Sequence, residues 1–174
     1  MRGFLLLALV AACGGDDGGE PGPDAGIAPV TKVFVVRHAE TTTDANDPGL
    51  SPAGQTRADG LAALLADDHL TAVYASQYRR TKDTGAPAAA GAGLTVQVKT
   101  VGASIPAYAT DLANTVKAAT APQAILIVGH SNTVPDTVMA LSGTGVPAIG
   151  ETEYNRLYVV TLAADGAHLE SMTY

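Results

Sequence analysis

The chain has 174 residues, of which 17 are acidic, 10 are Lys or Arg and one is a cysteine, and its formal net charge is -7 at pH 7. A single cysteine excludes an intramolecular disulfide framework, so an ordinary hydrophobic core has to stabilise the fold. The acidic balance argues against nucleic acid as a partner, because such a surface needs clustered Lys and Arg.

The first thirteen residues have the pattern of an export signal. Arg2 precedes an apolar run from Phe4 to Ala12, and small residues lead to the lone cysteine, Cys13. The run is too short to span a bilayer, which takes about 20 apolar residues. Its end is similar to the lipobox of bacterial lipoproteins, in which the cysteine is lipidated. We therefore expect a lipoprotein-type signal peptide over residues 1–13 and an exported protein of the bacterial envelope, on the periplasmic side or the outer membrane, held by the lipid anchor only.

Residues 14–29 are predicted to be a disordered tether. The segment is rich in Gly, Asp and Pro and has almost no large apolar side chain, so it cannot bury a core of its own. We expect folding to begin near Val30, and residues 30–174 are enough for one domain of ordinary size.

Strands and helices alternate along the rest of the chain. Short apolar runs predict strands at 33–36, 72–75 and 124–128. Helical patterns follow at 52–67, 78–90, 107–119 and 133–141, the first with Ser51 as N-cap and Pro52 at the first helical position. Segments 154–161 and 168–173, joined through Asp165-Gly166, predict a hairpin. The fold class is therefore α/β, with a mainly parallel central sheet, helices on both faces and an antiparallel edge.

Three predicted strands end in residues suited to phosphate chemistry. The first strand is followed by Arg37 and His38, the second by Ser76 and the Arg79-Arg80 pair, and the later one by Gly129 and His130. Ligands of open α/β sheets bind beyond the carboxyl ends of the strands, so we expect these side chains to meet at one edge.

The arginine pair breaks a local rule, because cations in the first turn of a helix face the positive end of its dipole. Such departures mark functional sites. Arg79 is expected to face solvent and Arg80 the site. Ser131, together with helix N-termini near Asn132 and Tyr78, would add donors for a bound anion.

Three segments in this order and spacing resemble the signature blocks of the histidine phosphatase (phosphoglycerate mutase-like) superfamily, and its short branch of small phosphohistidine phosphatases in particular. They are Arg37-His38-Ala39-Glu40, the run from Tyr74 to Thr84, and Val128-Gly129-His130-Ser131. The resemblance implies that His38 becomes phosphohistidine, that Arg37 and Arg80 hold the phosphoryl oxygens and that His130 hydrogen-bonds them.

The implied chemistry also agrees with physical expectation. A histidine nucleophile has to be neutral, and two guanidinium groups beside His38 lower its pKa by repulsion. Their planar forks match a phosphoryl group. We expect Glu40 to support a site residue. Ala39 replaces the usual glycine, and Asp44 stands where many members have a phosphate-binding asparagine. The acid for the leaving group stays unassigned among Asp44, Asp111, Glu151 and Glu153.

The prediction is a phosphatase that hydrolyses phosphate monoesters, or protein phosphohistidine, through phosphohistidine on His38, without cofactor or metal. Its substrate would be a phosphorylated small molecule or a phosphoprotein. A phosphoglycerate-type mutase is the first alternative, although about fifty residues between Arg80 and His130 leave little room for a substrate-enclosing insertion. A catalytically inactive anion-binding or interaction lipoprotein is the second. A metal hydrolase is disfavoured, because neither His38 nor His130 has a recognisable ligand spacing, and His69 and His168 are expected at the surface.

Overall fold

The computed structural model describes residues 30–43 and 46–174. The predicted signal peptide with Cys13, the tether and Asp44 lie outside these residues. Within the described ranges, no helix has the length and apolar character needed to cross a bilayer.

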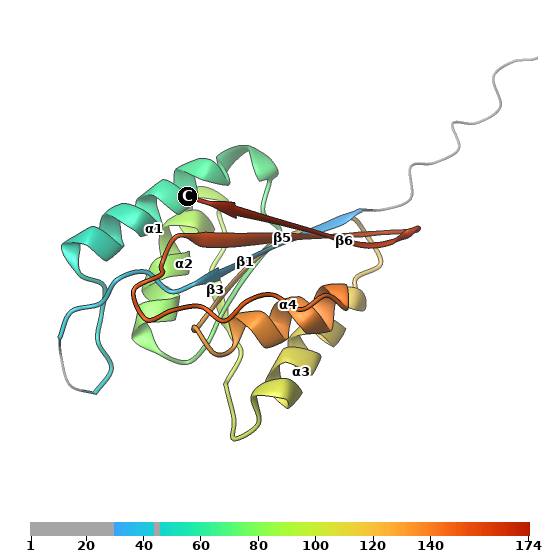
Figure 1. Ribbon diagram of the computed structural model, residues 1–174. Coiled ribbons are helices and arrows are strands. Elements are labelled where there is room, and N and C mark those ends of the chain that lie inside the picture. The colour runs from blue at the N-terminus through green and yellow to red at the C-terminus, as the bar shows by residue number, and fades with distance from the viewer. Residues whose placement is uncertain (1–29, 44–45) are drawn as a thin grey trace, which may run out of the picture.

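One six-stranded sheet forms the centre of the domain (Figure 1). Its strand order is β3-β2-β4-β1-β5-β6. The strands are β1 (Thr31–Arg37), β2 (Ala72–Ala75), β3 (Val96–Val98), β4 (Ala124–Gly129), β5 (Arg156–Ala163) and β6 (Gly166–Thr173). β1 to β4 run parallel to one another, and the β5–β6 hairpin adds two antiparallel strands beside β1. The predicted fold class is confirmed.

Four α-helices and one short 3₁₀ helix connect the strands. They are α1 (Pro52–Leu64), η1 (Ala66–Asp68), α2 (Arg79–Gly91), α3 (Ile105–Lys117) and α4 (Val134–Ser142). α1 begins as predicted, with the Ser51 side chain accepting a hydrogen bond from the Gly54 N–H and Pro52 in the first turn. Pro also stands in the first turn of α3 and α4, where its missing N–H costs no helical hydrogen bond.

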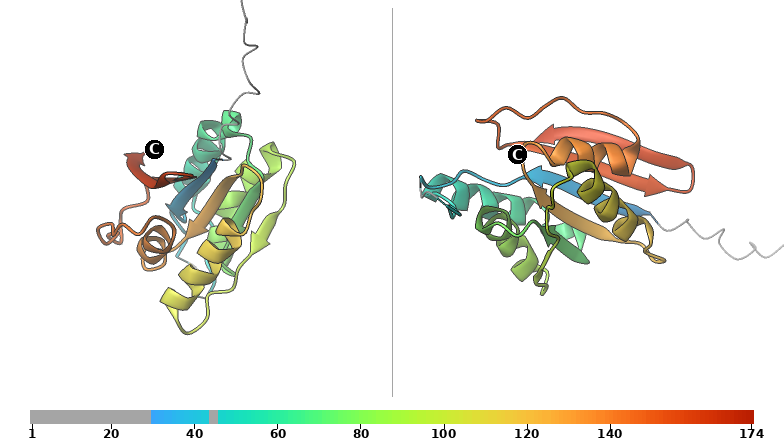
Figure 2. Two further views of the ribbon diagram at one scale, coloured as in Figure 1. Left: turned by 90° about the vertical axis from the view of Figure 1, so that its right-hand side faces the viewer. Right: turned by 90° about the horizontal axis from the view of Figure 1, so that it is seen from below.

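The hydrophobic core has two halves, one on each face of the sheet. Alternate residues of β1 point to opposite faces, so Val33 and Val35 pack with α3 and α4, whereas Phe34 and Val36 pack with α1 and α2. Figures 1 and 2 show the sheet between these two helical layers. Burial on both faces explains why residues 33–36 of β1 and 124–128 of β4 are continuously apolar.

The first predicted helix is too long, and one strand was not predicted. The helix stops at Leu64, Ala66–Asp68 form η1, and the next residue, His69, has a left-handed φ of 51°. β3 carries no strand signal in the sequence, because its three residues are mostly exposed and pair only with β2. His69 and His168 are both exposed, as expected.

Candidate active site

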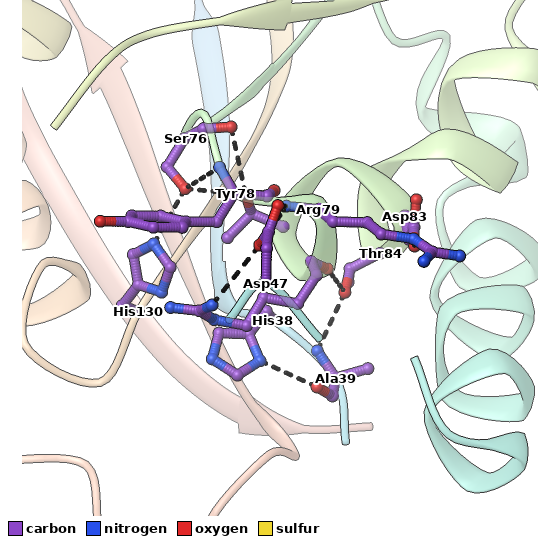
Figure 3. Close-up of polar contacts among 11 residues, drawn as sticks. His38, Ala39, Asp47, Ser76, Tyr78, Arg79, Asp83, Thr84 and His130 are labelled. Atoms are coloured by element: carbon purple, nitrogen blue, oxygen red, sulfur yellow. Dashed lines mark hydrogen bonds and ion pairs between the residues drawn. The ribbon is translucent and has the colours of Figure 1, made fainter. Parts of the chain in front are cut away.

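The register of the parallel strands brings three strand ends together. Arg37 pairs with Gly129 across β1 and β4, and Ala75 pairs with Val128 across β2 and β4. The next residues along the chain, His38, Ser76 and His130, therefore meet at one edge of the sheet. The rings of His38 and His130 lie 5.4 Å apart in a T-shaped arrangement (Figure 3).

His38 presents its Nε2 atom as the free ring nitrogen. Its Nδ1 lies 2.8 Å from the carbonyl oxygen of Ala39, and a carbonyl only accepts, so Nδ1 carries the proton and donates it. Neutral imidazole has one N–H, which leaves the lone pair on Nε2. Burial, together with the positive charges of Arg37 and Arg80, lowers the pKa of His38 to about 4. The predicted lowering of the pKa of His38 is confirmed, although burial contributes more to it than the two arginines do.

The backbone after His38 is held by α2. The N–H of Ala39 donates to the hydroxyl of Thr84 at 2.9 Å, and that hydroxyl donates to the carbonyl of Arg80 at 2.7 Å. Ala39 replaces the family's glycine without strain, because among the described residues only His69 is a non-glycine with positive φ. Thr84 thus ties the His38 segment to the turn that carries Arg80.

Arg37 is anchored by a loop far along the chain. Its Nη1 donates to the carbonyl oxygens of Gly150, Glu151 and Glu153 at 2.7, 2.8 and 3.2 Å, and its guanidinium lies 4.2 Å from the centroid of the Tyr154 ring. Its Nε is buried and has no hydrogen-bond partner among the described residues. A buried donor without a partner is costly, so this N–H is available to a bound anion.

The two adjacent arginines separate as expected. Arg79 is 63% exposed and pairs with Asp83 one turn along α2, at 3.2 Å. Arg80 is 21% exposed and lies among the pocket residues, with its guanidinium 4.6 Å from the centroid of the Tyr78 ring. Arg80 is therefore the arginine of this pair that can reach a ligand beside His38.

Asp47 is a site neighbour that sequence reasoning missed. Its two carboxylate oxygens accept hydrogen bonds from the backbone N–H of Arg79 at 2.9 and 3.1 Å, and one of them lies 3.9 Å from Nη1 of Arg80. The carboxylate thus caps the start of α2, where the N-cap residue Tyr78 makes no side-chain cap. The loop around Asp47 has no regular pattern, so nothing in the local sequence signals this long-range contact.

His130 is fixed by both its backbone and its ring. Its N–H donates to the Thr133 hydroxyl at 2.8 Å, and a side chain on Gly129 would collide with that hydroxyl. The ring nitrogen Nε2 lies 2.8 Å from Oγ of Ser76. Burial is the largest of the causes that lower the pKa of His130 to about 3, and Arg80, His38 and Arg37 are the others.

A pocket of about 400 Å³ opens over these residues. Its lining consists of His38, Tyr78, Arg80, Val101, His130, Ser131, Asn132 and Thr133. Ser131 thus stands at the pocket, just before α4, where we expected it. Tyr78 and Val101 add apolar surface that the sequence did not point to.

Glu40 faces α1. Its carboxylate accepts three hydrogen bonds from Arg57, at 2.7 to 3.1 Å, and both side chains are about three-quarters buried. The pair ties the segment after His38 to α1, which also approaches so closely that any side chain at Gly54 would strike the Glu40 backbone. The support expected from Glu40 is thus directed at α1.

Three of the four acid candidates lie in the described part of the chain. Asp111 pairs with Lys99 on the surface of α3, and Glu153 pairs with Arg156 and accepts from the Gly150 N–H. Glu151 is exposed and, like the other two, is not part of the pocket lining. No group of three or more His, Cys, Asp and Glu side chains with metal-binding geometry occurs within the described residues.

Comparisons with known proteins agree with this geometry. The family model of the histidine phosphatase superfamily (branch 1) matches residues 33–100, which hold the first two signature blocks. No curated protein sequence matches the chain. Solved structures with similar folds are numerous.

Three of these structures illustrate the similarity. A mycobacterial glucosyl-3-phosphoglycerate phosphatase is 15% identical, with a TM-score of 0.63, and the match covers 83% of this chain and 98% of that one. The protein histidine phosphatase SixA, complexed with tungstate, is 20% identical, with a TM-score of 0.61 and coverage of 82% and 97%. A protein described as mycobacterial hydrolase 1 is 16% identical, with a TM-score of 0.64 and coverage of 83% and 98%. At these identities, the similarity establishes a shared fold.

Proposed function

We propose that this chain, whose residues 33–100 match the histidine phosphatase family model, is a phosphatase that hydrolyses phosphate monoesters, or protein phosphohistidine, through a phosphohistidine formed on His38. The observation that carries the proposal is the neutral His38 ring, whose Nε2 lone pair stands in a pocket with Arg80 and His130. This arrangement is what nucleophilic attack on phosphorus requires.

The reaction has two steps. In the first, the Nε2 lone pair of His38 attacks phosphorus, a P–N bond forms, and the bond to the leaving atom, oxygen in an ester or nitrogen in phosphohistidine, breaks. The leaving atom keeps the electron pair of that bond and takes a proton from solvent. In the second, a water oxygen attacks phosphorus, and the P–N bond breaks to return the lone pair to Nε2. Division into two steps lowers the barrier of a difficult hydrolysis.

The arginines stabilise the charge on the transferring group. Arg80 lies at the pocket, and the Nε–H of Arg37 is a buried donor without a partner in the described residues. Donors that are fixed before the reaction stabilise a transition state without reorganisation. The guanidinium of Arg80 lies over the Tyr78 ring and that of Arg37 over the Tyr154 ring, which fixes both groups. Hydrogen bonds to backbone carbonyls fix Arg37 further.

The pocket favours a substrate with one phosphoryl group. Between α2 and β4 the chain forms only β3 and α3, so no inserted domain covers the opening. The Asp47 carboxylate lies 3.9 Å from Nη1 of Arg80 and would repel a second phosphate placed beside it. A monoester with a neutral leaving group, or a phosphoprotein side chain, therefore fits better than a bisphosphate.

A generic aryl phosphate tests the activity. Its good leaving group needs little acid assistance, so a phosphatase cleaves it, whereas a protein that only binds anions does not. We expect turnover by the wild type that survives a chelator and is abolished in His38→Ala. Absence of turnover in the wild type, or retained turnover in the variant, would contradict the proposal.

The predicted lipid anchor is a separate proposal and rests on residues 1–13 alone. We propose that the protein is exported and lipidated at Cys13. Expressed in a bacterium that processes lipoproteins, the wild type should fractionate with membranes and the Cys13→Ala variant should not. Membrane partitioning of the variant would contradict the anchor and leave the phosphatase assignment untouched.

A further inference from the structure

Two buried hydroxyl groups form a chain behind His130. Oγ of Ser76 lies 2.8 Å from Nε2 of His130 and 2.8 Å from Oγ1 of Thr81 (Figure 3). Ser76 and Thr81 are both fully buried. Because these hydroxyl groups are buried, their hydrogen-bond partners are protein atoms, and the protons of Thr81, Ser76 and His130 can be placed.

Those positions can be found by counting donors and acceptors. The Thr81 hydroxyl lies 2.8 Å from the carbonyl oxygen of Tyr78 and 3.2 Å from that of Ser76. A carbonyl only accepts, so the single hydroxyl proton of Thr81 points to a carbonyl. The Ser76 hydroxyl must then donate to Oγ1 of Thr81. Oγ of Ser76 is left as an acceptor, and the proton between it and His130 belongs to Nε2.

His130 is thus the opposite tautomer from His38. Its proton is on Nε2, and the lone pair is on Nδ1, which Figure 3 shows on the side of the ring that faces His38. His38 carries its proton on Nδ1 and its lone pair on Nε2. Both neutral rings therefore present an acceptor to the pocket.

An acceptor at Nδ1 cannot hydrogen-bond a fully deprotonated phosphoryl group, because phosphoryl oxygens are acceptors too. One proton has to lie between them. The charged and titratable groups that face His130 are Arg80, Arg37, His38 and the Tyr78 ring, with Asp47 beyond Arg80. Two guanidinium groups hold the ligand-free ring neutral, so this proton is taken up when the phosphoryl group binds, and Nδ1 of His130 and a phosphoryl oxygen share it.

We propose that Ser76 and Thr81 are positioning residues, which hold His130 in the Nε2–H tautomer so that Nδ1 and the phosphoryl group share one proton in the complex. Binding of a monoester dianion is then coupled to uptake of one proton. This inference rests on the proposed function for its ligand, but the tautomer itself does not depend on turnover. Because the second pKa of a phosphate ester is about 6, binding should weaken up to tenfold per pH unit above that value.

The tautomer can be read directly by ¹⁵N NMR of the ligand-free protein, which contains four histidines. Protonated and unprotonated ring nitrogens resonate far apart, so His130 should show a protonated Nε2 and His38 a protonated Nδ1. Thr81→Val keeps the shape but removes the acceptor for the Ser76 proton. That proton then turns to Nε2 of His130, and the tautomer should change to Nδ1–H. Thr81→Ser restores the acceptor and is the matched control.

The second measurement is proton uptake on binding phenylphosphonate, by calorimetry in two buffers of different ionisation enthalpy. Above the second pKa of the probe, the wild type and Thr81→Ser should take up about one proton per site, and Thr81→Val close to none. Should Thr81→Val fail to fold, Ser76→Ala replaces it, since this variant also removes the preference for Nε2–H. A wild-type His130 with its proton on Nδ1, or binding without proton uptake, would overturn the inference. Proton uptake without hydrolysis of any ester would instead contradict the proposed function.

Discussion

Replacement of Arg80 is the sharpest test of the pocket, because Arg79 is an adjacent control of the same chemistry. Arg80 is only 21% exposed, and its guanidinium is fixed on the Tyr78 ring beside both histidines. Loss of one preorganised donor lowers kcat by about 10²–10³-fold, or about 2.7–4 kcal/mol. We expect Arg80→Ala to fall in this range. Arg80→Lys should stay impaired, because an ammonium group keeps the charge but not the planar fork.

Arg79→Ala should behave differently. Its side chain is 63% exposed, and its partner Asp83 is an i,i+4 surface neighbour, a type of pair worth about 0.3–0.5 kcal/mol. We expect kcat to stay within about tenfold of the wild type. Steady-state kinetics with an aryl phosphate measures both variants. Equal losses, or a larger loss for Arg79→Ala, would refute the assignment of Arg80 to the pocket.

The same contacts lead to three further predictions. Burial lowers the pKa of His38 to about 4 and that of His130 to about 3, so kcat/KM should be lost as pH falls through about 4, not near 6.5. The free energy of unfolding should also decrease below pH 6.5, because both histidines bind protons near that pH in the unfolded chain but stay neutral in the folded protein down to about pH 4. Urea unfolding at several pH values measures this change. Glu40→Gln should cost about 1 kcal/mol or somewhat more in unfolding free energy with kcat nearly unchanged, because the carboxylate binds Arg57 outside the pocket. A fall in kcat without a loss of stability would show that Glu40 acts on the site itself.

The strand ends were predictable because buried parallel strands are short apolar runs, and the residues directly after such strands are exposed to ligand. The runs that end before Arg37 and His130 are continuously apolar, and the structure pairs them in register. The start of α1 was predictable for a similar local reason, since Ser51 and Pro52 favour a helix N-terminus. β3 carried no such signal, because it is short and half-exposed.

Contacts between distant segments could not be predicted in the same way. Nη1 of Arg37 is occupied by carbonyl oxygens more than 110 residues away, and no pattern near Arg37 signals it. Asp47 reaches the start of α2 from an irregular loop. The arginines beside His38 were visible in the sequence as a cause of its low pKa, but burial is the larger cause, and burial depends on the whole fold.

The proposed function depends above all on a covalent phosphoryl group at His38. The most direct measurement is to mix the wild type with an aryl phosphate, quench in alkali within a turnover and map the label by peptide mass spectrometry. A phosphoramidate is stable in base and labile in acid. We expect a base-stable, acid-labile phosphoryl group on the peptide that carries His38, and none in His38→Ala. A label on Ser76, Ser131 or His130, or a label that persists in His38→Ala, would contradict the proposed mechanism.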